Sequence, residues 1–163
     1  MHLCCDEAQI QTMDEGLSQS DGIFGRCPTC EKNLGASICE MTCAPDQSRF
    51  LTPGEVLTSP YDPEVEYLND IDYRIDDDFA KGIFDSCKGV IHPSSGHPAM
   101  DFVCGAYDFK TCDHRKWLTF LGDKENNEYV PFQITYIFDE PEEEHRLKRE
   151  AKFFFRRMRH LCS

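Results

Sequence analysis

The chain has 163 residues, of which 40% are hydrophobic and 12% aromatic, values typical of one folded domain and not of a disordered chain. Its formal net charge of −13 excludes a nucleic-acid partner, because binding to phosphates needs a basic surface. Ten cysteines are many for a chain of this length, and they predict disulfides formed in an oxidising compartment.

We expect neither a membrane span nor a signal peptide in the sequence as given. No apolar run approaches the roughly 20 residues of a membrane span. The first residues, Met1 to Glu7, lack both the basic start and the apolar stretch of a signal peptide. Because disulfides still have to form, we expect this chain to be an internal piece of a longer secreted or membrane protein.

A first helix is predicted to begin after Asp6, a favourable N-cap residue, and to end at about Leu17. Ile10, Met13 and Leu17 recur at helical spacing and form its apolar stripe. Gln9 lies at the edge of this stripe. It is either a residue at the solvent boundary or a single hydrogen-bonding group at the rim of an apolar pocket.

A second helix is predicted from Cys27 to Pro45, after a polar, glycine-containing turn at 18–25. Pro28 suits the first helical position, where its missing amide proton costs nothing. The apolar stripe of this helix consists of Leu34, Ile38 and Met41. Its cysteines divide between two sides, with Cys27 and Cys30 beside the stripe and Cys39 and Cys43 opposite. Such a helix can be joined to the rest of the fold from both sides.

The remaining elements predict an α+β fold, with several helices packed on a small sheet. Alternating apolar residues predict strands at 65–67, 71–75 and 131–138. Helices are predicted after the three aspartates 76–78, and at 99–104 and 113–121. Residues 51–64 contain several prolines and are expected to form an irregular loop.

Residues 146–163 differ from the rest of the chain in composition. They hold seven Lys/Arg and one Glu around three phenylalanines, whereas residues 1–145 carry 10 basic and 29 acidic side chains. We interpret residues 1–145 as the domain and 146–163 as a basic tail foreign to it. A membrane-surface helix is the alternative for the tail.

No motif in the sequence predicts an enzyme or a metal centre. Cys27-x-x-Cys30 resembles a redox motif, but such a motif should follow a strand, and residues 22–25 make a poor one. Zinc held by the four cysteines of the second helix is a further alternative. On one continuous helix, however, the two cysteine pairs point in opposite directions. We find no phosphate-binding loop and no nucleophile elbow, and we expect no catalytic residue and no cofactor.

Three stretches resemble one protein family in their cysteines, prolines and intervening polar residues. They read Cys4-Cys5-Asp6-x-x-Gln9-Ile10-Gln11-Thr12, Arg26-Cys27-Pro28-Thr29-Cys30-x-x-Asn33-Leu34 and Cys39-Glu40-Met41-Thr42-Cys43-Ala44-Pro45. The family is the lumenal N-terminal domain of the Niemann-Pick type C cholesterol transporters, and the likeness extends over about residues 4–138.

This resemblance implies a helix-rich domain with a small mixed sheet and a deep apolar pocket for one sterol. Such a domain takes cholesterol in the lumen of late endosomes and lysosomes, by handover from the small soluble Niemann-Pick type C sterol carrier. The sterol enters with its hydroxyl group first. The parent protein spans the membrane, although this chain contains no span of its own.

The resemblance also implies the residues of the sterol site. Gln9 matches the glutamine that binds the 3β-hydroxyl, and Thr12 matches the threonine beside it. Phe102 and Val103 match a pair at the pocket entrance, where transfer occurs. The apolar lining would include Met13, Ile38, Phe102, Leu121, Pro131, Phe132 and Ile134. Burying the sterol body would supply affinity, and a buried hydroxyl needs a hydrogen-bond partner.

The disulfides implied by the family pattern are Cys5–Cys43, Cys30–Cys87 and Cys104–Cys112. In this pairing the partners of Cys4, Cys27 and Cys39 are expected outside the chain, and Cys162 belongs to the foreign tail. The family segment before Cys4, with a pocket-lining tryptophan and a hydroxyl-binding asparagine, is expected to be missing.

Two alternatives to sterol binding and transfer follow from the same residues. One is a disulfide-stapled extracellular interaction module that binds no sterol. The other is a vitamin-binding pocket of the related folate-receptor type, which would need stacking aromatic side chains. Trp117 is the only tryptophan, which disfavours the vitamin pocket, and the presence of Gln9 and Thr12 favours the sterol.

Overall fold

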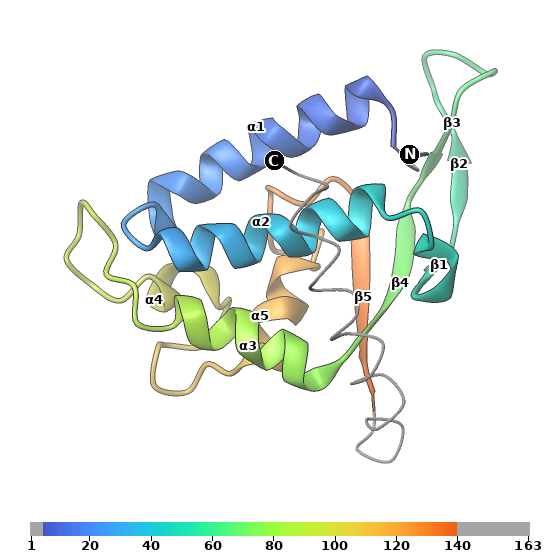
Figure 1. The fold of residues 1–163 in the computed structure, drawn as a ribbon. Helices are drawn as coiled ribbons and strands as arrows, with labels where there is room; N and C mark the ends of the chain where they lie inside the picture. Colours follow the sequence, from blue (N-terminus) through green and yellow to red (C-terminus); the bar gives the residue numbers. More distant parts are fainter. Residues whose placement is uncertain (1–4, 140–163) are drawn as a thin grey trace.

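The protein is described by a computed structural model, which places residues 5–139 in an α+β fold and so confirms the predicted class (Figure 1). The helices are α1 (Glu7–Phe24), α2 (Pro28–Cys43), α3 (Asp77–Cys87), α4 (Met100–Val103) and α5 (His114–Leu121), with a 3-10 turn at Gln47–Arg49. The strands are β1 (Leu51–Pro53), β2 (Val56–Thr58), β3 (Glu66–Leu68), β4 (Asp70–Ile75) and β5 (Gln133–Phe138). The predicted tail, Cys4 and Cys162 lie outside the described residues.

Helix α1 begins where Asp6 predicts but ends at Phe24, so the predicted turn at 18–25 is wrong. The last turn of α1 buries Phe24, which is 3% exposed in the hydrophobic core. Ser18 Oγ and Ser20 Oγ donate to the backbone oxygens of Asp14 and Leu17 inside the helix, at 2.9 Å each. Tertiary packing therefore outweighs the weak helix propensity of the glycine and serine residues in this segment.

Helix α2 has the predicted start and is joined to the fold near both of its ends. Cys27 is its N-cap and Pro28 its first residue. Cys30, in the first turn, forms a disulfide with Cys87 at the end of α3, and Cys43 forms one with Cys5 just before α1. Helix α2 is thereby fixed to one helix on each side, as its cysteine pattern predicts.

The main sheet has the order β1-β4-β5 and is mixed, as expected. Strand β1 pairs with β4 antiparallel, and β5 pairs with β4 in parallel, with Ile71 opposite Ile134. Strands β2 and β3 form a separate antiparallel hairpin, which projects from the body beside β4 (Figure 1). The prediction of a loop over 51–64 is wrong in part, because β1 and β2 form there by pairing with segments that follow later in the chain.

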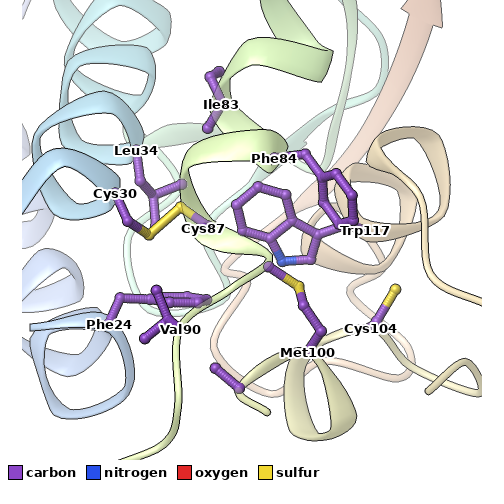
Figure 2. Close-up of a cluster of buried hydrophobic side chains, with 11 residues drawn as sticks. Phe24, Cys30, Leu34, Ile83, Phe84, Cys87, Val90, Met100, Cys104 and Trp117 are labelled. Carbon is purple, nitrogen blue, oxygen red and sulfur yellow. A yellow bond between two sulfur atoms is a disulfide. The ribbon is translucent and has the colours of Figure 1, made fainter. Parts of the chain in front are cut away.

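Two clusters of buried side chains make up the core. The first surrounds Trp117, which is fully buried and packs its ring against Phe24 and Phe84 with centroid distances of 6.1 and 5.8 Å (Figure 2). The second lies on the sheet and consists of Ile71, Tyr73, Ile75, Ala80, Leu118 and Ile134. None of the helices within residues 5–139 has the length and apolar character needed to cross a membrane.

Candidate functional site

Gln9 and Thr12 lie on the first turns of α1, and both are exposed. The side chain of Gln9 completes a capping box with Asp6: Gln9 Oε1 accepts from the Asp6 backbone N–H at 3.0 Å. Thr12 Oγ1 donates to the Ala8 backbone oxygen at 3.0 Å. The groups left for a ligand are therefore the amide protons on Gln9 Nε2 and the lone pairs of Thr12 Oγ1.

Helices α1 and α2 run side by side in opposite directions (Figure 1). The Cys5–Cys43 disulfide joins the start of α1 to the end of α2, so the first two turns of α1, which carry Gln9 and Met13, lie toward that end. The helices approach closely at Gly35, where a Cβ atom would lie 3.6 Å from Leu17 Cδ2. Met13 and Ile38 are both half-buried, and Ile38 packs against the first core cluster. Apolar surface on these two helices therefore remains accessible beside the predicted hydroxyl-binding residues.

Other residues predicted to line the pocket lie on α5, on β5 and just before β5. Leu121 packs against both core clusters, Phe132 packs against the second, and Ile134 belongs to it. The join between α5 and β5 is tight, since Ile134 N donates to Gly122 O at 2.9 Å and a Cβ at Gly122 would clash with Ile134 O. Ile134 is only 7% exposed, so it acts mainly as a core residue.

The structure does not bring every predicted site residue into this group. Gln9 and Thr12 belong to neither core cluster, and Pro131 is exposed. The predicted entrance residues lie on α4, where Phe102 is 53% exposed and Val103 packs against the first cluster. The ring of His92 lies 5.2 Å from the ring of Phe102 and supports it from one side. The pocket itself, and each residue's role in it, stay predictions.

The three disulfides expected from the family pattern are present: Cys5–Cys43, Cys30–Cys87 and Cys104–Cys112. Cys39 is also disulfide-bonded, which corrects the expectation that its partner lies outside the chain. Cys27 is a free thiol and donates a weak hydrogen bond to the Ser86 backbone oxygen at 3.6 Å.

The disulfides and the elements around them weigh against both alternatives for the cysteines of α2. Zinc cannot be held by the four together, because Cys30 and Cys43 are already in disulfides, and the described residues hold no other group of His, Cys, Asp and Glu that could bind a metal. The thioredoxin-like redox alternative needs a strand before Cys27, and the residues there are the end of α1 and a turn.

Glu40 is a candidate that the sequence reasoning missed. It lies on α2 one turn after the buried Ser37, and its charge acts on Tyr73 of β4. Burial, and secondly the nearby charge of Asp46, raise the pKa of Glu40 to about 8. The carboxyl group is therefore largely uncharged at mildly acidic pH. The sequence signal that could have identified Glu40 is its position one helical turn after Ser37, a small and buried residue of α2.

Trp117 bears on the vitamin-binding alternative. Its ring is fully buried, and its Nε1 has no hydrogen-bond partner among residues 5–139. In Figure 2 this nitrogen faces Met100. A tryptophan enclosed in the core in this way has no free face on which a planar ligand could stack, so the structure weighs against a folate-receptor type of pocket that depends on this residue.

Comparison with known proteins places these features in a family. The family model described as Niemann-Pick C1 N terminus matches residues 1–159. The chain is 49% identical over 144 residues to NPC intracellular cholesterol transporter 1 homolog 1b of Drosophila melanogaster, covering 88% of this chain and 11% of that protein. It is 33% identical over 141 residues to NPC intracellular cholesterol transporter 1 of Sus scrofa, covering 85% of this chain and 11% of that protein.

The chain thus spans about a tenth of the length of the curated relatives it matches. The family match extends beyond residue 145, so the division between a domain and a foreign tail at that point stays a prediction. Because the match covers nearly the whole chain, it decides the family and, with it, the non-enzymatic class. The chain belongs to the family of Niemann-Pick C1 N-terminal domains, the N-terminal domains of intracellular cholesterol transporters.

Proposed function

We propose that this chain binds one sterol, with cholesterol as the reference ligand, and passes it on as the N-terminal domain of an intracellular cholesterol transporter. The observation that carries the proposal is the family match over residues 1–159, and the half-buried Met13 and Ile38 support it by leaving apolar surface accessible on α1 and α2. Ile38 and Leu121 are partly buried and both pack against the first core cluster, and the relatives are named as cholesterol transporters.

The polar end of the site would be Gln9. Because its Oε1 is engaged by the Asp6 backbone, we infer that Nε2 donates to the oxygen of the 3β-hydroxyl, with Thr12 Oγ1 as a second partner. An unpaired buried hydroxyl costs about 1–3 kcal/mol, so this contact sets the orientation of the ligand. The sterol body would supply most of the affinity, at about 25 cal/mol per Å² of apolar surface buried, before the costs of association.

The proposed setting is the acidic lumen of late endosomes and lysosomes. The uncharged state of Glu40 at mildly acidic pH suits a domain that works there, since no buried carboxylate then has to be accommodated. We place sterol exchange with the small soluble Niemann-Pick type C carrier at Phe102 and Val103. The exposure of Phe102 supports this position for contact with a partner.

Equilibrium binding of radiolabelled cholesterol to the oxidised protein at mildly acidic pH tests the proposal. We expect saturable binding that Gln9→Ala weakens by about tenfold, from the loss of one hydrogen bond to a buried group. Gln11→Ala is the matched control, because Gln11 is exposed on the same helix and its Nε2 donates to Glu15 at 3.2 Å. Absence of saturable binding, or equal losses in both variants, would contradict the proposed site and favour an interaction module without a sterol.

A further inference from the structure

The loop between α4 and α5 displays aromatic side chains that the proposed sterol-binding residues do not account for. Tyr107 is 44% exposed and Phe109 is 45% exposed. They follow shortly after the exposed Phe102 on α4. In Figure 1 this loop, drawn in gold, lies with α4 at the end of the molecule away from the β2–β3 hairpin. We call residues 104–112 the aromatic loop.

The aromatic loop is held in one conformation by several bonds. The disulfide Cys104–Cys112 closes it at its base. Asp108 Oδ1 accepts hydrogen bonds from the backbone N–H groups of Lys110 and Thr111, at 3.1 and 2.9 Å. Asp101 Oδ1 accepts from the Phe109 N–H at 2.8 Å, which ties the loop to α4. The two rings are therefore ordered before any partner arrives, which lowers the entropic cost of binding through them.

A lysine amine lies over each ring of the aromatic loop. Lys110 Nζ is 5.6 Å from the centroid of the Phe109 ring, and Lys116 Nζ is 4.7 Å from the centroid of the Tyr107 ring. Tyrosine rings and lysine side chains are enriched at the boundary between water and lipid, and Phe is found on the apolar face of segments that bind there. There the ring sits at the level of the headgroups, and the amine reaches the phosphate groups and water.

The charge of this region differs from that of the rest of the described chain. Residues 98–118 carry three acidic and three basic side chains, so they are neutral overall. The other residues between 5 and 139 carry 22 acidic and seven basic side chains, a balance of −15. Anionic headgroups would repel a surface of that charge, whereas residues 98–118 can approach a lipid surface without this cost.

We propose that the aromatic loop docks against the headgroup region of a phospholipid bilayer, with Tyr107 and Phe109 as its anchors. A protein partner is disfavoured, because covering the Phe109 ring would also bury the amine of Lys110, for which that partner would have to supply a carboxylate. The amine of Lys116 is already paired within the chain, with Asp113 Oδ2 at 2.9 Å and the Thr111 backbone oxygen at 2.6 Å. A phospholipid surface offers phosphate groups at the required level. The inference goes beyond sterol binding and does not depend on it.

Sedimentation with vesicles of phosphatidylcholine that contain no sterol tests this inference on the full chain. We expect the wild type to bind and the double variant Tyr107→Ala/Phe109→Ala to bind at least about tenfold more weakly, from the lost apolar burial. The matched control is Tyr61→Ala/Tyr129→Ala, which removes two rings that are 96% and 70% exposed elsewhere. Equal denaturation midpoints would establish that both variants fold.

Three outcomes would overturn the inference. The first is a wild type that does not bind vesicles, and the second is an equal loss in the loop and control variants. The third is a loop variant that binds vesicles as tightly as the wild type. Binding through the basic segment 146–163 would give this third result, because every variant contains that segment. If that variant lost binding to the purified soluble sterol carrier instead, the loop would be a protein-docking surface. Sterol binding is measured in a separate experiment, and its result does not affect this inference.

Discussion

Gln9 and Asp6 are joined by two reciprocal hydrogen bonds across the first turn of α1. Asp6 Oδ1 accepts from the Gln9 N–H at 2.8 Å, and Gln9 Oε1 accepts from the Asp6 N–H at 3.0 Å. The residue proposed to recognise the sterol therefore also stabilises the start of its own helix. This double role fixes the amide group of Gln9, so that its oxygen is occupied and its Nε2 remains available as a donor.

The first prediction separates these two roles of Gln9. In Gln9→Glu the carboxylate can still accept from the Asp6 N–H, so we expect the free energy of unfolding to change by less than about 0.5 kcal/mol. The variant has lost the donor, and we expect cholesterol to bind at least about fivefold more weakly. Urea denaturation and sterol binding measure the two effects. A Glu variant that binds as tightly as the wild type would refute the assignment of Nε2 as the donor.

The second prediction concerns the apolar residues of the proposed site. Ile134 is 7% exposed in the second core cluster, so Ile134→Ala should lower the free energy of unfolding by about 2–4 kcal/mol. Ile38 is half-buried, and Ile38→Ala should cost about 1 kcal/mol in stability while weakening sterol binding. Urea denaturation of both variants, with binding assays on Ile38→Ala, checks this. Unchanged affinity in Ile38→Ala would remove that residue from the site.

The third prediction ranks two of the disulfides. Cys30–Cys87 closes a sequence separation of 57 residues and Cys104–Cys112 one of only 8. On loop-closure entropy alone, removing the first should cost about 4 kcal/mol and removing the second about 2.5 kcal/mol. Paired Cys→Ala variants, compared by urea denaturation, test the order. A larger loss on removing Cys104–Cys112 would contradict it.

The fourth prediction is a pH dependence of stability caused by Glu40. Its pKa is about 8 in the folded state, against an ordinary value of 4.5. Between these values the folded state keeps a proton that the unfolded state releases, so the free energy of unfolding falls as the pH rises from about 4.5 to 8. Below and above this window Glu40 contributes no slope. Partial solvent exposure makes the effect smaller than the full pKa difference implies.

Glu40→Gln tests this pH dependence, because glutamine stays uncharged. We expect the wild type to lose stability between pH 5 and pH 8 relative to the variant, and the variant to be the more stable of the two at pH 8. Urea denaturation at both pH values measures this. The aspartates whose pKa values are lowered, such as Asp77 and Asp85, contribute in a separate window below about pH 4, where stability falls with falling pH. If the free energy of unfolding depended on pH in the same way in the wild type and in Glu40→Gln, Glu40 would be ruled out as the cause of the pH dependence.

Local signals in the sequence predicted most of the helices. The caps Asp6, Asp76 and Asp113 each bond the N–H three residues later, and Pro28 begins α2 as expected. The end of α1 could not be predicted in this way, because it depends on Phe24 reaching a core partly built from Trp117, far along the chain. Helix propensity is a property of the local sequence and does not predict contacts between residues far apart in the chain.

Strands and the chemistry of the site were less predictable. Strand β1 has only three residues and forms by pairing with β4, where Leu51 lies opposite Tyr73. No periodicity of apolar residues can be recognised in so short a segment. The disulfide pairs followed from the family pattern, since spacing alone leaves many pairings open. The raised pKa of Glu40 depends on burial between α2 and the sheet, which a sequence does not display.

Competition between cholesterol and its 3α epimer tests the central claim most directly. If Gln9 on α1 recognises the 3β-hydroxyl at the end of an apolar site, unlabelled cholesterol will displace radiolabelled cholesterol from the oxidised protein, and the 3α epimer will not. The Gln9→Ala variant will reduce this discrimination, and Gln11→Ala will keep it. Equal competition by both epimers, or no saturable binding at all, would contradict a stereospecific sterol site in this chain.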